Sequence, residues 1–187
     1  LRRQRQMCIR DSNSILLKDV SLVFSRPSAT AVRASLERDA PFEAVPAPFD
    51  VYQESSGGDN WRSTNHLNRQ REVPLRVQGY QVRTGSVVRE GKRATPIVAL
   101  EAAEGTTAVT VPEFWENFPR AIAYDGTTLT VRFFPGQFPD LHELQPGEQK
   151  TASCIVAFAT DSTTAEPLLW ARSPIVATVE REWRSTS

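Results

Sequence analysis

The sequence predicts an all-β protein, an antiparallel β-sandwich that is a fragment of a larger multidomain protein. At least seven short apolar or alternating segments follow one another closely, and no convincing amphipathic helix separates them. Thirteen prolines and nine glycines are scattered along the chain, as in a turn-rich β protein. The 187 residues, of which 40% are hydrophobic, suffice for one large domain with its own core.

Residues 1–12 are set apart from the fold because they are basic and have no apolar period. They resemble the in-frame translation of a sequencing adapter, and the alternative is a genuine basic arm. They hold four of the 22 basic and one of the 22 acidic residues, which leaves 18 and 21 and a net charge of −3 in the remainder. They also hold Cys8, so Cys154 alone provides no internal disulfide.

The charge balance excludes two classes of partner. The formal net charge of the whole chain is zero, so it has no electrostatic footprint for nucleic acid or for an anionic membrane. No apolar run reaches the roughly 18 residues that a membrane span needs. We therefore expect no nucleic acid and no membrane as partners.

The first part of the chain contains one predicted strand and one segment of undecided type before a proline-rich connector. Residues 14–24 are rich in aliphatic residues and predict a strand that ends at Arg26 and Pro27. Residues 30–37 fit a strand or a short helix equally well. Three prolines punctuate residues 41–48, and residues 49–52 then lead into a polar loop.

Beyond that loop, alternation predicts strands again. Residues 73–78 place Val73, Leu75 and Val77 on one face, and the phase flips after Gly79, which predicts a β-bulge. Residues 95–100 and 106–111 predict two further strands joined through Glu104 and Gly105.

The last third begins with residues 112–119, which are aromatic and bounded by prolines. They predict one helical turn or a crossover that packs Phe114, Trp115 and Phe118, with Trp115 in the core. Residues 121–134 form the clearest hairpin, with Asp125 and Gly126 at its turn. Further strands are expected at 151–158, 168–170 and 174–179.

Two polar segments, 53–69 and 134–150, each hold one of the two histidines, His66 and His142. Long loops without secondary structure are uncommon in compact domains, and those that occur are usually either functional or disordered. Trp61 and several side-chain amides argue against a disordered linker. We expect the two loops to lie at the same end of the sandwich, with both histidines within reach of one substrate.

The residue types in these loops match the needs of carbohydrate binding. Amides and charges bind sugar hydroxyls, and the Trp61 ring suits the C–H face of a sugar. A uronate also needs a cation for its carboxylate, here Arg62 or Arg69, and a base with a pKa near neutrality, here His66 or His142. The candidate catalytic residues are therefore His66 and His142, and the candidate substrate-binding residues are Asn60, Trp61, Arg62, Asn65, Asn68, Arg69, Glu143 and Gln145.

A purely structural interpretation remains open for each of these residues. Polar residues in loops often bond their own backbone. On this interpretation Trp61 plugs the end of the sandwich and His142 with Glu143 is a structural pair. No metal-binding, phosphate-binding or dinucleotide motif is present, so we expect neither a metal nor a cofactor.

The same loops resemble the PcRGLX/YetA-like proteins, the exo-rhamnogalacturonan lyase family. The matching segments are 53–61, 65–69, 73–80, 114–119, 134–138 and 142–150, and the resemblance runs from about residue 14 to the end. In that family a small barrel precedes a central β-sandwich, and an α/α toroid follows. The resemblance implies that residues 13–179 are the central sandwich domain and that residues 180–187 begin the linker to a missing toroid.

The resemblance also implies an extracellular or periplasmic enzyme that cleaves pectic rhamnogalacturonan by β-elimination. Its partners would be a uronate-containing polysaccharide and the toroid of the same protein. The toroid would supply much of the cleft, so this fragment alone is expected to be inactive. The alternatives are a non-catalytic carbohydrate-binding or scaffolding module and an accessory domain of a glycoside hydrolase.

Overall fold

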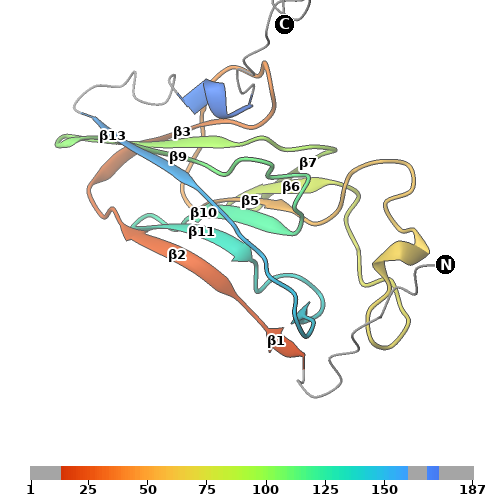
Figure 1. Ribbon diagram of the computed structural model, residues 1–187. Coiled ribbons are helices and arrows are strands. Elements are labelled where there is room, and N and C mark those ends of the chain that lie inside the picture. Colours follow the sequence, from red (N-terminus) through yellow and green to blue (C-terminus); the bar gives the residue numbers. More distant parts are fainter. Residues whose placement is uncertain (1–13, 160–167, 173–187) are drawn as a thin grey trace, which may run out of the picture.

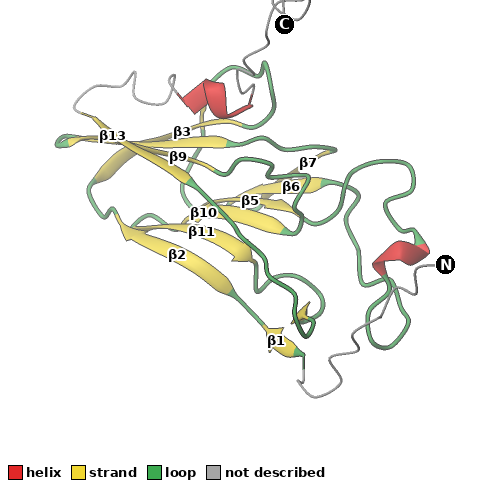
Figure 2. Cartoon of the chain, in the orientation of Figure 1, coloured by secondary structure: helices red, strands yellow, loops and turns green. Residues whose placement is uncertain are grey.

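The computed structural model describes residues 14–159 and 168–172, and within them the protein is an antiparallel β-sandwich, as predicted (Figure 1). Strands and connecting loops make up nearly all of this part of the chain, with two short helical turns (Figure 2). The predicted arm at 1–12, the strand at 174–179 and the linker at 180–187 lie outside the described residues.

One layer of the sandwich is a six-stranded sheet, and the other is a five-stranded sheet. In spatial order the six-stranded sheet consists of β2 (Val20–Ser25), β11 (Thr128–Phe134), β10 (Arg120–Tyr124), β5 (Phe49–Gln53), β6 (Tyr80–Thr84) and β7 (Val87–Gly91). The five-stranded sheet consists of β13 (Ile155–Ala159), β9 (Gly105–Thr110), β8 (Ile97–Ala102), β3 (Ala29–Ser35) and β4 (Glu43–Ala44).

A third, two-stranded sheet pairs β1 (Ile15–Leu17) with β12 (His142–Leu144) beyond the end of β2. The predicted strand at 14–24 is therefore interrupted at Lys18 and Asp19, so that its first part pairs with a segment of the second polar loop. The strands β4, β7 and β12 were not predicted; β4 and β12 are only two and three residues long.

The core lies between the two large sheets and follows the period of two expected of strands. In β11 the buried residues Leu129, Val131 and Phe133 alternate with half-buried ones. They belong to one apolar cluster with residues of the opposite sheet such as Leu100 and Val109. Each such large side chain contributes about 1.5–3 kcal/mol on burial.

The predicted hairpin at 121–134 is confirmed as β10 and β11. Gly126 has a φ of +104° in its turn, where a residue without Cβ is favoured. Both Thr127 and Thr128 donate backbone N–H groups to the Asp125 carboxylate at 2.8 Å. The strands predicted at 95–100 and 106–111 are likewise present as β8 and β9. The segment at 30–37, which fitted a strand or a short helix, contains most of the strand β3 (Ala29–Ser35).

Residues 73–78 were expected to be a strand, and this prediction is wrong. The backbone N–H groups of Arg76 and Val77 instead donate to the buried carboxylate of Glu54. A side-chain acceptor thus satisfies donors that a neighbouring strand would otherwise bond. Gly79 was expected to form a β-bulge within this strand, but it precedes the start of β6 (Tyr80–Thr84). Its carbonyl accepts N–H groups from both Glu54 and Ser55.

The prediction of a strand at 168–170 is also wrong, because residues 168–172 form a 3-10 turn on the outer side of the five-stranded sheet. Leu168 packs there against Ile97, Ala99 and Ala108, while Leu169 and Trp170 stay exposed. The buried guanidinium of Arg172 anchors the turn through Ser35 and the Thr95 carbonyl.

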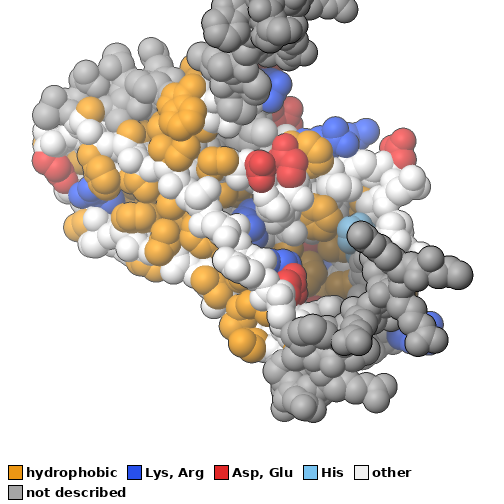
Figure 3. Space-filling view, viewed as in Figure 1, with side chains coloured by type: hydrophobic (Ala, Val, Ile, Leu, Met, Phe, Trp, Pro, Cys, Tyr) orange, Lys and Arg blue, Asp and Glu red, His pale blue; other side chains and the backbone are white. Residues whose placement is uncertain are grey.

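The sandwich also exposes apolar side chains at one long edge. On the face drawn in Figure 3, hydrophobic side chains gather over β2 and β13. Val23 of β2 and Phe158 of β13 are 63% and 60% exposed.

Candidate functional site

A cavity of about 420 Å³ lies at one end of the sandwich, where the two polar loops meet. The loops were predicted to lie at the same end, and this is confirmed, since both line the cavity. The lining residues are His66, Leu67, Asn68, Arg69 and Gln70 around the first loop and Phe138, Asp140, Leu141, Glu143 and Gln145 of the second; His142 is not among them. Leu16 of β1 and the turn at Phe118 and Pro119 complete its walls. The cavity therefore combines segments that are distant in sequence.

Two polar contacts join the loops across the cavity. Asn68 Nδ2 donates to Asp140 Oδ2 at 2.8 Å. A guanidinium nitrogen of Arg69 lies 2.6 Å from Glu143 Oε1. The two contacts come from adjacent residues of the first loop, so they fix its position relative to the second.

The first loop is built on local backbone contacts around a 3-10 turn, η1 (Thr64–His66). The amide of Asn68 also closes the following turn, since its Oδ1 accepts the Glu72 N–H at 2.9 Å. Asn68 thus uses its carbonyl oxygen within its own loop and its NH₂ group on the partner loop. This double use is typical of asparagine in turns.

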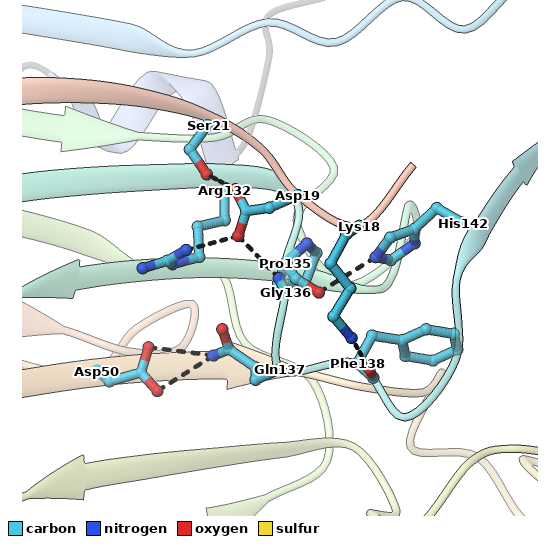
Figure 4. A network of polar contacts seen from close by, with 10 residues as sticks. All are labelled: Lys18, Asp19, Ser21, Asp50, Arg132, Pro135, Gly136, Gln137, Phe138 and His142. Atoms are coloured by element: carbon cyan, nitrogen blue, oxygen red, sulfur yellow. Dashed lines mark hydrogen bonds and ion pairs between the residues drawn. The ribbon is translucent and has the colours of Figure 1, made fainter. Parts of the chain in front are cut away.

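The second loop is fastened to the strands beneath it (Figure 4). Asp19, in the break between β1 and β2, accepts the Gly136 N–H at 2.8 Å and a guanidinium N–H of Arg132 at 2.6 Å. Gln137 Nε2 donates to the Asp50 carboxylate on β5 at 3.2 Å. Although partial burial opposes it, hydrogen bonds from Ser21, Gly136 and Arg132 hold the pKa of Asp19 below its usual value.

His142 is buried beneath the second loop and lies between two phenylalanine rings. Its ring centroid is 5.0 Å from that of Phe134 and 5.1 Å from that of Phe138, the latter stacked. Its Nε2 lies 3.1 Å from the carbonyl oxygen of Pro135, to which it donates (Figure 4). Burial lowers the pKa of His142 and favours the neutral imidazole. This environment favours a structural role.

His66, by contrast, lines the cavity directly. Its imidazole packs edge-on against the Phe118 ring, with centroids 5.5 Å apart. The half-buried ring ends the 3-10 turn, so short local backbone bonds set its direction. Of the two histidines, His66 is the one that a ligand in this cavity would meet.

The polar rim of the cavity carries a cation and an anion already in contact. Hydrogen bonds from Arg69 and from Ser14 lower the pKa of Glu143 to about 2, so this carboxylate is ionised at neutral pH. Its ion pair with Arg69 is solvent-accessible on both sides, with side-chain exposures of 49% and 28%. The guanidinium therefore keeps donors available for a ligand anion.

The structure brings together five of the ten predicted site residues and places the others elsewhere. The cavity is lined by His66, Asn68, Arg69, Glu143 and Gln145. Arg62 lines a shallower depression next to it and lies over the Trp61 ring at 5.5 Å. Asn60 and Asn65 are exposed, and Trp61 is half-buried.

Sequence reasoning missed the apolar side of the cavity. Phe118 and Phe138 line it together with Leu67 and Leu141, which are 44% exposed. Phe118 was expected to pack inside the fold and Trp115 to lie in the core. Both side chains are only half-buried. The useful signal was the proline next to each phenylalanine, which ends the regular structure and leaves the ring at a loop surface.

The fold and the cavity define an antiparallel β-sandwich with a loop-walled binding site at one end. Comparisons of the chain with family models, curated proteins and solved structures gave no match. Within residues 14–159 and 168–172, no group of three or more potential metal ligands comes together. In the same ranges no helix has the length and apolar character needed to cross a membrane.

Proposed function

We propose that this sandwich is the module of a polysaccharide lyase-like protein that acts on pectic rhamnogalacturonan by β-elimination. The observation that carries the proposal is the cavity between the two loops. It offers apolar rings to the C–H face of a sugar and amides, carboxylates and a guanidinium to its hydroxyls. Its volume of about 420 Å³ falls within the range of small-ligand sites.

The chemistry assigns separate tasks to the residues at the rim. Arg69 binds the uronate carboxylate, because a guanidinium pairs with a carboxylate through two parallel hydrogen bonds. His66 removes the proton α to that carboxylate, the electrons of the C–H bond form the C=C double bond, and the C–O bond to the leaving sugar breaks. The departing oxygen takes a proton from water. Stabilisation of the enolate-like transition state by Arg69 is the larger contribution. His142 supports the second loop and does not meet the sugar.

The contact between Arg69 and Glu143 favours a second candidate, a non-catalytic carbohydrate-binding module. A guanidinium that is already neutralised by a carboxylate at 2.6 Å attracts a uronate less strongly. Such a module binds the polysaccharide and releases no product. An accessory domain of a glycoside hydrolase would likewise bind the polysaccharide without releasing a product.

Binding of rhamnogalacturonan oligosaccharides to the purified chain, measured by calorimetry, tests the proposal. We expect Arg69→Ala to weaken binding about tenfold, because one charge-assisted contact is worth about 1.5–3 kcal/mol. The matched control is Asn65→Ala, an exposed residue of the same loop outside the cavity. Equal affinities for both variants would contradict a sugar site at this cavity.

The lyase and the binding module differ in their products. A lyase leaves an unsaturated uronate that absorbs ultraviolet light. In the longer protein that the family resemblance implies, His66→Ala should abolish this absorbance while His142→Asn should retain it. If the longer protein binds the polysaccharide but generates no such absorbance, the binding module is correct.

A further inference from the structure

A second cavity lies away from the cavity between the two polar loops (the loop cavity), at the end of the five-stranded sheet where β3 and β9 end and β8 begins. Its volume is about 680 Å³, larger than that of the first. The turn at 168–172 forms one wall, and the turn at 112–116 forms the opposite one. The short connection that carries Arg93 and Thr95 lies between them.

Two tryptophans line this cavity. Trp170 is 56% exposed, although tryptophan is among the most costly side chains to leave in water. Trp115 is half-buried, and the Arg93 guanidinium lies 4.3 Å from the centroid of its ring. The cavity thus offers one open indole and one indole capped by a cation.

The remaining polar lining is charged and balanced in sign. Three carboxylates and three guanidinium groups line the cavity, from Glu37, Glu113, Glu116, Arg38, Arg93 and Arg172. Within the described part of the chain none of the six forms an ion pair within 4.0 Å. Five of them instead bond neutral partners, as in the bond from the Tyr80 hydroxyl to Glu37 at 2.7 Å.

The walls of the cavity are also fixed in place. Arg172 bonds Ser35 and the Thr95 carbonyl, and this anchors the turn that carries Trp170. Asn117 donates to the Glu113 carboxylate at 2.9 Å and so holds the opposite turn. The hydroxyl oxygen of Thr95, which lines the cavity, is buried without a hydrogen-bond partner in the described structure.

We infer that this cavity is a second binding site, for an uncharged oligosaccharide. The open face of Trp170 suits the C–H face of a pyranose. Sugar hydroxyls both donate and accept hydrogen bonds, so they match a lining with equal numbers of carboxylates and guanidinium groups. Because the charges cancel, the site gains no net attraction for a uronate. The inference is independent of the function proposed for the loop cavity.

The test is calorimetric titration of the full chain with galactotetraose, xylotetraose and cellotetraose as neutral probes and tetragalacturonate as the charged one. We expect at least one neutral tetrasaccharide to bind and Trp170→Ala to weaken it at least about tenfold, as for aromatic residues at the centre of binding sites. The matched control is Leu169→Ala, which alters the exposed neighbour of Trp170 on the same turn and should change the affinity less than about twofold.

Three outcomes would overturn the inference. The first is that none of the neutral tetrasaccharides binds. The second is that the Trp170→Ala and Leu169→Ala variants bind the neutral tetrasaccharide equally well. The third is that tetragalacturonate binds more tightly than the neutral tetrasaccharides and requires Trp170. Arg93→Gln provides a second variant that keeps the fold, because Arg93 is exposed, and it should also weaken neutral binding. Trp170→Ala should leave the binding of rhamnogalacturonan oligosaccharides at the loop cavity unchanged, so failure at one cavity is distinguishable from failure at the other.

Discussion

Single glycines show how closely the segments around the first loop pack. Gly57 has a φ of +70°, and a Cβ placed there would overlap the backbone carbonyl of Lys92. Gly85, in the turn between β6 and β7, has a φ of +59° but has nothing within 4 Å of that position. The two glycines share the same backbone requirement and differ only in the space around them.

This pair yields a prediction about stability. Gly85→Ala should lower the free energy of unfolding by about 1–2 kcal/mol, the cost of a left-handed conformation. Gly57→Ala should cost at least about 2 kcal/mol more, because the Lys92 backbone must also move. Urea unfolding of both variants measures the difference, and equal losses would mean that the loop start adjusts freely.

The sequence revealed the Gly57–Gly58 break but not its reason. Glycine pairs usually mark turns, and nothing in the local sequence indicates that residue 92 lies against residue 57. The same holds for Glu54, since charged side chains are rarely fully buried. It is 3% exposed and accepts two backbone N–H groups and the Tyr52 hydroxyl. Such roles depend on tertiary neighbours, which composition and periodicity do not describe.

At the scale of elements, the contact between the two loops depends on one amide. Asn68→Asp preserves the shape of the side chain but replaces an NH₂ donor with an oxygen that faces the Asp140 carboxylate. We expect this variant to lose about 1–3 kcal/mol at neutral pH, because a hydrogen bond becomes a like-charge contact. Much of the loss should be recovered at about pH 3, where carboxyl groups begin to be protonated.

Unfolding by urea at both pH values measures this effect, and limited proteolysis reports whether the loops open locally. Asn65→Asp is the matched control, since it adds the same charge to the same loop at an exposed position. A similar loss in the control would show that overall charge, rather than the bond to Asp140, causes the effect.

The sequence predicted best those elements whose residues alternate regularly between apolar and polar and whose turns carry a characteristic motif. The hairpin of β10 and β11 has alternation on both strands and an Asp-Gly turn, and its prediction is confirmed. Residues 73–78 have the same alternation, yet the chain supplies Glu54 as their hydrogen-bond acceptor in place of a strand. Sequence patterns also predicted only part of the loop cavity. Its polar rim was predicted from residue types, whereas its apolar wall of Phe118 and Phe138 depends on where the neighbouring prolines end the regular structure.

At the scale of the whole molecule, the buried imidazole of His142 couples stability to pH. Burial depresses its pKa in the folded state, so the unfolded chain binds a proton more readily. The folded state is therefore fully favoured above the unfolded pKa of about 6.5, and stability falls as the pH drops below it. His142→Asn should flatten this decline.

The free energy of unfolding, measured by urea between about pH 7.5 and about pH 5.5, tests the coupling. His66→Asn is the matched comparison, because it removes the other histidine, which lies at the cavity wall. If His66→Asn flattens the slope and His142→Asn does not, the assignment of the coupling to the buried ring is wrong.

The pairing of β1 with β12 has a consequence for how the protein is made. Ile15 lies opposite Leu144, and β2 and β3 likewise pair with strands that are synthesised much later. Folding slows as the mean sequence separation of contacting residues grows. The strands β1 and β2 thus leave the ribosome well before their partners β12 and β11 do. The exposed valine and leucine side chains of β2 make it the segment that most needs protection from aggregation during that interval.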